Sequence, residues 1–559
     1  MQNRVNSASE RKVIPETVRK IIEARGIEDE DLQEFLSSKP RLAYDPFLLA
    51  NMREGVDLLL NAIDSGKRIV IYGDYDVDGI TSTALLMKVL SQFTDNLSYY
   101  IPSRIDEGYG LHMDAIDRIK KDGGEFILTV DCGSVSKEET AYAHSLGIET
   151  LVTDHHNMSD MKAEGLVINP RQSGDVYPFK GLAGVGVAYK LALAIARTRE
   201  VDSGLMAELP ELATVGTIAD IMPMLDENRT LVKCGLRSMR LGCRNKGLRE
   251  LIDRSSIDYK RIKASDISYG IAPKINASGR MGDATLGVRL LLSEDENEIR
   301  ECCDALLEAN AERRRLQEEA YDKGVEMLDD ELAKGDFIIV EINDSHEGVL
   351  GIVAGKLREK INRPVVVVSS NGDIYKGTGR SIPSVNLFEM LDKYRDDFIS
   401  FGGHGAACGF TIAADKLDEL RTKLNEDIAV MREECEDMFD LCYDYDAELE
   451  TSDVDLDLAE SLQLLEPCGK DNEVPLFAIK NAEIDNWKFL KDDTKMARFA
   501  IAKEDGRHID SVIFSDAAEA YDTLQSGNVD VIGNVEINVW RDERKVQFIA
   551  RQILPGGDL

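Results

Sequence analysis

Short runs of apolar residues alternate with amphipathic stretches along the first third of the chain. The runs are rich in Val, Ile and Thr and end in polar turns: RIVIYG (68–73), FILTV (126–130), ETLVT (149–153) and LVIN (166–169). Segments with helical spacing, such as TSTALLMKVL (81–90), lie between them. This alternation predicts an α/β fold in which helices cover a parallel sheet and ligands bind at the carboxyl ends of the strands.

A long helical pattern separates this region from a second one of the same kind. Residues 286–334 predict a connecting helix, and Ser293, three residues before Glu296, predicts a capping box near its start. Strand and helix runs then return, as in FIIVEI (337–342) and PVVVVSS (364–370). Residues 335–445 therefore predict a second α/β domain.

The last part of the chain has the pattern of a small β domain. The acidic stretch 448–460 predicts a linker, and five strand-like runs with one helical segment (516–527) follow it. These runs predict an OB-type β barrel, although another small barrel would leave the same pattern. With a helical lead-in at the start, the predicted parts are 1–66, 67–285, 286–334, 335–445 and 446–559.

The composition agrees with several folded domains. Of the 559 residues, 43% are hydrophobic and 30% charged, and single cores rarely exceed about 250 to 300 residues. We find no apolar run long enough to span a membrane and no N-terminal signal segment, so a cytoplasmic protein is expected. Nine cysteines without a C-x-x-C pair predict reduced core residues and no zinc site.

The charge limits how the protein could bind nucleic acid. It has 67 basic and 103 acidic residues, a formal net charge of −36. A broad basic face that coats nucleic acid is therefore improbable. Phosphate can still be bound by a few basic side chains and backbone N–H groups in a cleft, and carboxylates that hold cations would add to the negative charge.

The densest candidate site is IYGDYDVDG (71–79), where Asp74, Asp76 and Asp78 follow an apolar strand. Three carboxylates this close repel one another unless a cation neutralises them, which favours a hard-metal site. A calcium-binding EF-hand loop would need a bidentate Glu where Leu85 stands, so that interpretation fails. A solvated acidic turn is the remaining alternative for this motif taken alone.

Three further apolar runs end in metal-binding residue types. FILTVDCG ends in Asp131, ETLVTDHH in Asp154, His155 and His156, and ELATVGTIADIMP in Asp220. If these runs are strands of one sheet, their ends meet in one crevice. Aspartates with an imidazole and no thiolate suit Mn²⁺ or Mg²⁺, and bridging carboxylates suit two-metal phosphoester hydrolysis. A core or capping role for the histidines becomes the minority interpretation.

These motifs carry a family resemblance. DYDVDG, DCG, DHH and IADIMP, in this order, resemble the DHH phosphoesterase superfamily. Later segments resemble its RecJ family of single-strand-specific 5′-to-3′ DNA exonucleases: APKINASGRMGDA (272–284), HEGVLGIVAGKL (346–357), KGTGRSI (376–382), FGGHGAACGF (401–410) and LEPCGKDNEVPLF (465–477). The resemblance runs from about residue 45 to the end. It implies a DHH domain, a DHHA1 domain and an OB domain.

The resemblance also implies a set of catalytic residues that hold the metal. They are Asp76, Asp78, Asp131, His155 and Asp220, which would bind two Mn²⁺ or Mg²⁺ ions with Asp131 between them. Asp74 and His156 would support these ligands or contact the substrate. Sister branches of the superfamily have a histidine ligand where this chain has Tyr72, and a phenol is a poor ligand for these ions. The occupancy of the second ion is therefore open.

Five further residues are implied in phosphate or DNA binding. Arg280, Thr378, Arg380 and His404 lie in Gly-rich segments, and Arg104 lies in IPSRIDEGYG. Guanidinium groups bind phosphate bidentately, so these residues would hold the 5′-phosphate and the neighbouring backbone. A tight turn without a ligand is the alternative for each segment.

The function that follows is a metal-dependent exonuclease that removes 5′-mononucleotides from single-stranded DNA in repair and recombination. The resemblance implies a monomer, with a single-strand-binding protein and a helicase as partners. One alternative is a DHH-family phosphodiesterase for short oligonucleotides or nucleotide phosphates, which needs no OB domain. Another is a non-catalytic replication scaffold, in which the ligand positions would be degraded.

The C-terminal barrel offers separate candidates for DNA binding. Trp487, Phe489, Trp540 and residues 541–545 could contact bases or phosphates, with core packing as the alternative for the aromatic residues. All implied ligands precede residue 221. Truncation near residue 448 is therefore expected to leave the chemistry assembled and to weaken binding of long strands.

Overall fold

The computed structural model describes residues 14–37, 39, 43–104, 106–158, 162–440, 444–490, 494–525, 527–541, 543–557 and 559. The chain folds as two compact units. One contains residues 44–220 and 235–442, and the other contains the N-terminal segment up to residue 43, residues 221–234 and the chain from residue 443. Within the described ranges, no helix has the length and apolar character needed to cross a membrane.

The first sheet has five parallel strands in the order β2-β1-β3-β4-β5. Their bounds are Ile69–Tyr72 (β1), Leu97–Tyr100 (β2), Phe126–Val130 (β3), Glu149–Thr153 (β4) and Leu166–Ile168 (β5). The sequence predicted all but β2, an edge strand whose four residues are only half-buried. The chain leaves β1 towards one edge and β3 towards the other, so the strand order reverses between β1 and β3. In such sheets this is the point where ligands bind.

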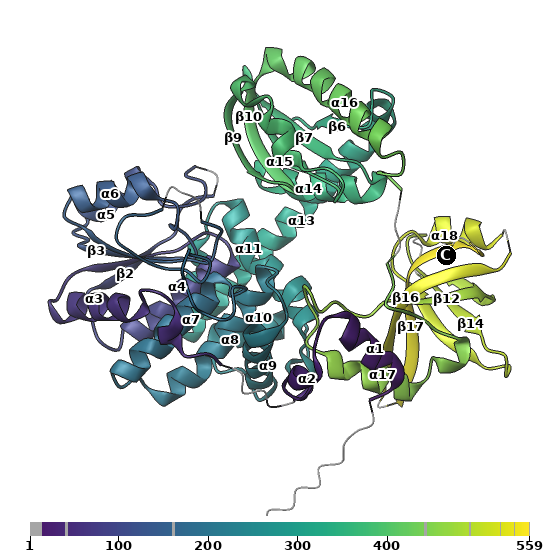
Figure 1. The fold of residues 1–559 in the computed structure, drawn as a ribbon, viewed down its shortest axis with the longest axis horizontal. Coiled ribbons are helices and arrows are strands. Elements are labelled where there is room, and N and C mark those ends of the chain that lie inside the picture. The colour runs from purple at the N-terminus through teal and green to yellow at the C-terminus, as the bar shows by residue number, and fades with distance from the viewer. Residues whose placement is uncertain are drawn as a thin grey trace, which may run out of the picture. The chain divides into compact units, whose positions relative to one another are not determined.

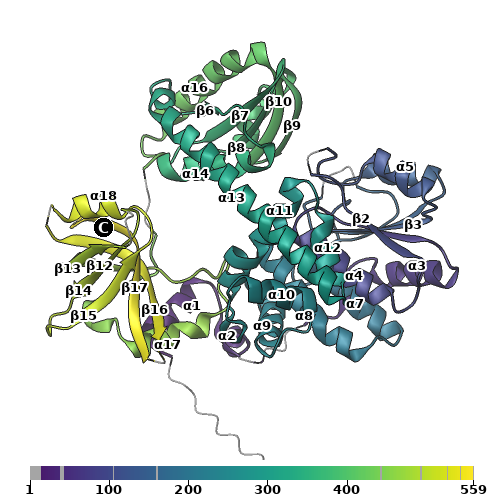
Figure 2. The same ribbon diagram turned by 180° about the vertical axis from the view of Figure 1, so that it is seen from behind.

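Helices cover both faces of this sheet (Figures 1 and 2). The helices are α3 (Met52–Asp64), α4 (Val77–Leu90) and α7 (Gly184–Thr198) on one face, and α5 (Met113–Lys121) and α6 (Lys137–Ser145) on the other. Val70, Tyr72 and Ile127 pack against Ile116 of α5 and Ala143 of α6. Because both faces are covered, β1 and β3 consist of fully buried residues.

The apolar run before Asp220 forms a helix, so the prediction of a strand there is wrong. The run is the end of helix α8 (Ser203–Ala219), and Asp220 is the C-cap residue. From Glu211 to Ile218 every residue is buried, because α8 packs against α4 and α7. A helix that is buried on all sides has no polar stripe, so its sequence cannot be distinguished from a buried strand.

Further helices lead to the second sheet. They are α9 (Asp226–Arg240), α10 (Lys246–Arg254), a π-helical turn (Asp266–Ile271), α11 (Ala272–Met281), α12 (Thr285–Leu292) and α13 (Glu296–Leu332). The predicted capping box at α13 is wrong: Asp295 is the N-cap and accepts from the N–H groups of Asn297 and Glu298. Ser293 instead donates to the Glu298 carboxylate (2.7 Å).

The second sheet is mixed, in the order β6-β7-β8-β10-β9. Its strands are Ile338–Glu341 (β6), Val365–Asn371 (β7), Ile374–Arg380 (β8), Phe398–His404 (β9) and Ala407–Ala413 (β10). The accompanying helices are α14 (Glu347–Ile361), α15 (Leu387–Asp392) and α16 (Leu417–Glu434). Ala320 and Leu328 in the second half of α13 pack into this domain's core. The long helix therefore belongs to the second domain as well as to the first.

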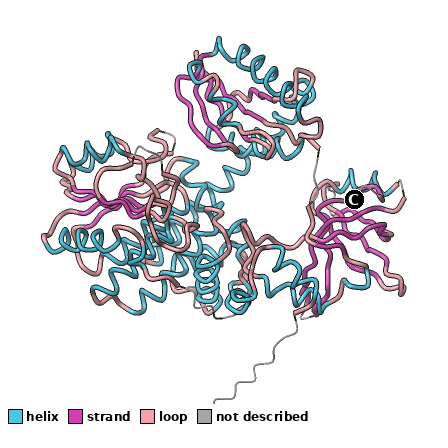
Figure 3. Tube along the Cα trace, in the orientation of Figure 1, coloured by secondary structure: helices cyan, strands magenta, loops and turns pink. Residues whose placement is uncertain are grey.

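The C-terminal unit has a seven-stranded sheet in the order β11-β12-β16-β17-β15-β14-β13, drawn in magenta in Figure 3. Its strands are Ala447–Glu448 (β11), Phe477–Ala482 (β12), Ile484–Phe489 (β13), Ala497–Ala502 (β14), His508–Ile513 (β15), Val529–Trp540 (β16) and Glu543–Pro555 (β17). Helix α18 (Ala517–Leu524) lies between β15 and β16 in sequence. The prediction of five strands was too low: β11 was missed, and so was β13, of which only Ile484 lay in the first predicted run.

Two segments that were predicted as a linker and as a lead-in contribute to the core of this domain. Val454 and Leu458, from the acidic stretch, are buried in it, and residues 456–462 form helix α17 (Leu456–Leu462). The prediction of a linker there is wrong. Helices α1 (Glu16–Ala24) and α2 (Asp29–Leu36) contribute Ile21, Ile22 and Phe35 to the same core. The predicted lead-in 1–66 is thus divided, because α3 covers the first sheet.

The aromatic candidates of this domain are engaged in packing. The Trp487 ring stacks on Phe499 (centroids 5.1 Å apart), and Phe489 lies edge-on to Trp487. Both pack against the core, which favours the packing interpretation over base contact. The side chain of Trp540 and residue 542 lie outside the described residues. Arg544 pairs with Glu460, and Lys545 with Glu543.

Candidate metal centre

The turn after β1 holds three carboxylates close together. Asp76 is the N-cap of α4, and its carboxylate accepts from the N–H groups of Asp78 (2.9 Å) and Gly79 (3.1 Å). Asp74 and Asp78 are almost fully buried, with 3% and 1% exposed. A β-carbon at Gly79 would lie 2.5 Å from the backbone nitrogen of Asp74, so the tight turn requires glycine there.

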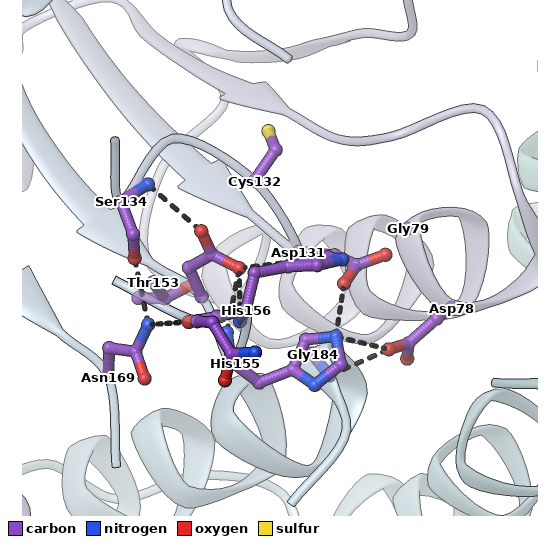
Figure 4. Close-up of polar contacts among 12 residues, drawn as sticks. Asp78, Gly79, Asp131, Cys132, Ser134, Thr153, His155, His156, Asn169 and Gly184 are labelled. Carbon is purple, nitrogen blue, oxygen red and sulfur yellow. Dashed lines mark hydrogen bonds and ion pairs between the residues drawn. The ribbon is translucent and has the colours of Figure 1, made fainter. Parts of the chain in front are cut away.

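The strand ends of β3 and β4 bring Asp131 and His155 to the same place. The Nε2 atom of His155 lies 3.1 Å from an Asp131 oxygen, 3.4 Å from an Asp220 oxygen and 3.9 Å from an Asp78 oxygen. Figure 4 shows the His155 ring pointing towards Asp131 and Asp78. Asp220 arrives from the end of α8. The sequence pattern thus identified Asp220 as a member of this group but predicted a strand, where the structure has a helix, before it.

The donor atoms fit a divalent cation. Asp131 Oδ1, Asp220 Oδ2 and His155 Nε2 are buried and make no well-formed hydrogen bond among the described residues. Burial and the charge of Asp78 raise the pKa of Asp131 well above its usual range, and burial and Asp78 raise the pKa of Asp220 to about 8. Burial lowers the pKa of His155 to about 3, which keeps its ring neutral. Buried carboxylates that repel one another beside a neutral imidazole suit Mn²⁺ or Mg²⁺.

The candidate ligands form two groups, which a third group links through Asp131 and His155. Asp78, His155 and Asp220 make one group, and Asp74, Asp76 and Asp131 make another, each with ligand atoms within 4.8 Å of one another. Asp131 also lies within this distance of His155 and His156. The arrangement can hold two ions with Asp131 between them. It also places Asp74 among the donors, although the family resemblance implied a supporting role for that residue.

Two glycines let helices approach these carboxylates. A β-carbon at Gly184, the first residue of α7, would lie 2.5 Å from Asp131 Oδ1. A β-carbon at Gly216 in α8 would lie 2.8 Å from Asp78 Oδ1. The N–H groups of Gly184 (2.6 Å) and Val185 (2.8 Å) donate to Asp78, which fixes the orientation of its carboxylate.

Asp154 organises the histidine pair, a role that was not predicted from the sequence. Its carboxylate accepts from the N–H groups of His155 (2.7 Å) and Ser134 (2.9 Å) and bonds to His156 Nδ1 (2.8 Å). Burial lowers the pKa of His156, but the bond to Asp154 and the charges of Asp154, Asp220 and Asp78 together outweigh it and raise the pKa to about 9. His156 also meets the Tyr109 hydroxyl (3.0 Å). A carboxylate directly before a histidine pair was the available signal for this role.

Tyr72 is not positioned as a ligand. It is fully buried, stacks on Tyr100 (5.2 Å between centroids) and donates from its hydroxyl to the Gly110 carbonyl (3.0 Å). Burial raises its pKa well above the usual value, so the phenol stays protonated. Tyr72 is therefore not available to bind a metal ion.

The structure brings four of the five implied phosphate residues into a common environment. Burial and the charges of Arg104, Arg313 and Arg380 lower the pKa of Arg280 to about 10. Arg280 donates to the Gly348 carbonyl in the first turn of α14 (3.0 Å). A β-carbon at Gly351 in the same helix would lie within 3.3 Å of both Thr378 and Arg380. Arg104 lies over the Tyr75 ring, 4.9 Å from its centroid.

His404 is more exposed than these four residues. It pairs in register with Ala407, which in turn pairs with Arg380, so it lies two strands from Arg380 in the same row of the sheet. Its Nδ1 accepts from the Ala406 N–H (3.3 Å). No contact between His404 and the arginines is present in the described part of the chain.

We predict that Mn²⁺ stabilises the protein more at about pH 8 than at about pH 5. The raised pKa values mean that Asp131 and Asp220 bind more protons in the folded, metal-free protein than in the unfolded chain between about pH 4 and 8, so their contribution to stability falls as the pH rises. A cation replaces those protons, and at about 100 times its Kd it contributes about 2.7 kcal/mol. Thermal unfolding with Mn²⁺ or EDTA at both pH values measures the gain. An equal gain at both would contradict the prediction.

Known proteins resemble the chain in each of its parts. Family models match over residues 68–217 (DHH family, N-terminal domain), 334–429 (DHHA1 domain) and 445–552 (RecJ OB domain). The single-stranded-DNA-specific exonuclease RecJ of Bacillus subtilis is 34% identical, over 98% of this chain and 69% of its own length. The protein of the same name from Salmonella typhimurium is 30% identical, over 97% and 96%.

Solved structures agree with the sequence matches. The crystal structure of RecJ in complex with Mn²⁺ from Thermus thermophilus has a TM-score of 0.81 at 28% identity and covers 98% of this chain and 77% of its own. The complex of RecJ from the same organism with Mg²⁺ has a TM-score of 0.74 at 27% identity, over 97% and 75%.

Proposed function

The chain belongs to the RecJ family of single-stranded-DNA-specific exonucleases, and on this premise we propose that it hydrolyses single-stranded DNA from the 5′ end and releases 5′-mononucleotides. The observation that carries the proposal is the convergence of buried donor atoms without hydrogen-bond partners around His155, with Asp131 next to both carboxylate groups. Solved RecJ structures with Mn²⁺ and with Mg²⁺ support the choice of ion.

We assign the holding of the ions to Asp76, Asp78, Asp131, His155 and Asp220, with Asp74 as a further donor. Divalent cations bound there would supply activation of water and neutralisation of the charged phosphate oxygens. The chain itself fixes the donors: N–H groups of α7 orient Asp78, and Asp154 orients both histidines. His156, with its raised pKa, carries a positive charge near neutral pH and faces the substrate phosphate in this proposal.

We assign the 5′-phosphate to the cluster of Arg104, Arg280, Thr378 and Arg380, with His404 at its edge. The arginines repel one another and have no carboxylate within ion-pair distance among the described residues, so an anion would relieve the repulsion. A pocket for the terminal phosphate would set the direction of degradation.

We predict that Arg380→Ala reduces the preference for 5′-phosphorylated over 5′-hydroxyl strands by about ten- to a hundredfold, the value of a charge-assisted contact. His404→Ala should have the smaller effect, because His404 lies two strands away. The ratio of kcat/KM for the two substrates measures the preference. An unchanged ratio in both variants would place the end pocket elsewhere.

The experiment that tests the function compares strands labelled at either end. In the presence of Mn²⁺, a 5′ label should appear at once in mononucleotides, whereas a 3′ label should stay in progressively shorter strands. Release of the 3′ label first would contradict the polarity. Cleavage limited to di- and trinucleotides would favour the phosphodiesterase alternative, and no cleavage the scaffold.

Several further proposals rest on the same family membership. We propose a cytoplasmic monomer that acts in DNA repair and recombination with a single-strand-binding protein and a helicase. We also keep the domain boundaries 67–285 (DHH), 286–334 (connecting helix), 335–445 (DHHA1) and 446–559 (OB-type) as proposals, with 1–66 divided as described above.

A further inference from the structure

A row of cations without acidic partners lies on helices α11 and α13. In this acidic protein many of the described arginines and lysines form ion pairs, but Lys274, Arg313 and Arg314 have no carboxylate within 4 Å in the described part of the chain. Arg313 bonds instead to the neutral side chains of Asn310 and Gln317 (2.8 Å to Gln317). The row is therefore available to an anion.

The cations occupy one side of α13. Positions 310, 313, 314 and 317 follow the helical repeat and lie on one face. On another face, Arg315 is paired with both Glu312 and Glu319. The paired Arg315 and the unpaired cations thus lie on different faces of α13. A helix that is solvated alike on all sides is not expected to show this separation.

The row is continuous with the arginine cluster assigned to the 5′-phosphate. After burial, Arg313 is among the charges that lower the pKa of Arg280, and Arg314 lowers the pKa of both Arg313 and Lys274. Each cation is thus close to the next, from Arg280 through Arg313 and Arg314 to Lys274. Helices α11 and α13, which carry these four residues, pack side by side (Figures 1 and 2).

The second half of helix α11 lies beside the metal motif. A β-carbon at Gly279 would lie 2.8 Å from the Tyr75 carbonyl, and Asn276, in the middle of the helix, accepts from the Val77 N–H (3.2 Å). At its beginning, Lys274 donates to the Gly270 carbonyl. Lys274 and Arg280 are six residues apart, which is about 9 Å along the helix, so the row extends beyond the arginine cluster itself.

An exposed aromatic side chain lies at the far end of the row. Tyr269 is 84% exposed, and it stands in the π-helical turn that precedes α11, next to the carbonyl that Lys274 contacts. Cations in a line with a free aromatic face are the combination by which proteins bind single strands without sequence preference.

We propose that Lys274, Arg313, Arg314 and Tyr269 form a track for the single-stranded substrate on the 3′ side of the scissile bond, with the cations on its phosphates and Tyr269 stacked on a base. The proposal rests on the proposed function and extends it. An exonuclease that cleaves near one end must hold the rest of the strand, and Trp487 and Phe489 of the OB domain are engaged in packing. The track supplies that grip within the catalytic unit.

The test is binding of 3′-fluorescein-labelled oligodeoxythymidylates, of about 4 and about 24 nucleotides, by fluorescence anisotropy of the full chain in EDTA at several salt concentrations. For the long strand, the double variant Lys274→Ala/Arg314→Ala should bind about tenfold more weakly at about 0.1 M salt. Its slope of log Kd against log salt should fall by about 1.4, the change expected when two phosphates are no longer neutralised. The short strand should lose less affinity.

Tyr269→Ala should also weaken binding of the long strand about tenfold, but with an unchanged salt slope, because stacking releases no counterions. Tyr269→Phe should restore binding. Arg315→Ala, a paired arginine on the same helix, is the matched control and should leave affinity and slope as in the wild type.

Two outcomes would overturn the track. If the double variant kept the wild-type salt slope, these cations would not bind the phosphates of the strand. The row would then bind another anion, such as an acidic segment of a protein partner. Equal losses on short and long strands would place these residues in the 5′ pocket. If the variants bind DNA as tightly as the wild type does, only the track is contradicted. If the wild type binds neither strand, the proposed function is contradicted.

Discussion

Replacing Asp131 by Asn is expected to reduce nucleotide release by more than about a thousandfold while the protein stays folded. Asp131 belongs to two groups of potential ligands, so its loss disturbs the binding of both ions. A loss of about 4 kcal/mol of transition-state stabilisation corresponds to this factor. Asn is preferable to Ala because Asp131 has φ 61°, a left-handed conformation that Asn tolerates and most other residues do not.

The same variant separates catalysis from stability. In EDTA, Asp131→Asn should be at least as stable as the wild type, because it removes a carboxylate repelled by Asp78, Asp76 and Asp220. With Mn²⁺ it should gain less stability than the wild type. Thermal unfolding under both conditions, beside turnover, measures this. A folded variant that retains a tenth of the activity would remove Asp131 from the centre.

The sequence was sufficient to find most of the metal centre. Asp74, Asp76 and Asp78 follow a buried strand, Asp131 and His155 follow two more, and the ends of parallel strands meet at one edge. Asp220 was found by its position after an apolar run, although that run is a helix. The sequence could not show which residues orient the ligands. Asp154 orients the histidines and N–H groups of α7 orient Asp78, and both roles depend on contacts that form only in the folded chain.

The packing of the C-terminal unit was the least predictable part of the fold. Val18, Ile21 and Ile22 form a helical stripe, which shows that α1 is buried on one side but not against what. In the structure they share a core with Phe477 and Phe548, which come far later in the chain. The acidic stretch near 450 was misinterpreted for the same reason, because its few apolar residues, such as Val454, find partners that are distant in sequence.

This packing changes the expected result of removing the C-terminal domain. Truncation before residue 444 should abolish activity on short and long strands alike, instead of sparing the short ones. It would expose the apolar faces of α1 and α2 and remove the partners of residues 221–234, which belong to the same unit and directly follow Asp220. Turnover on strands of about 4 and about 24 nucleotides, beside thermal unfolding, measures the loss. Normal turnover on the short strand would restore the original expectation.

A point substitution tests the same dependence without shortening the chain. Arg229 is 3% exposed and donates to the carbonyls of Phe35, Leu464, Leu465, Glu466 and Pro467. Arg229→Met leaves these carbonyls without their donor and should cost about 3 to 5 kcal/mol of stability, since each buried unsatisfied group costs about 1 to 3 kcal/mol and some will find water. Arg237→Met, on the exposed side of the same helix, is the control.

Arg229→Met should also disturb the metal centre, because a short backbone segment connects its helix to Asp220. Because residues 221–234 directly follow Asp220, Arg229→Met should weaken Mn²⁺ binding at temperatures where the protein is still folded. Titration of Mn²⁺ against thermal stability measures that binding, with Arg237→Met again as the control. Unchanged metal affinity in a destabilised variant would show that the metal centre is independent of the C-terminal unit, and the loss on truncation would then have to come from the exposed apolar faces of α1 and α2 alone.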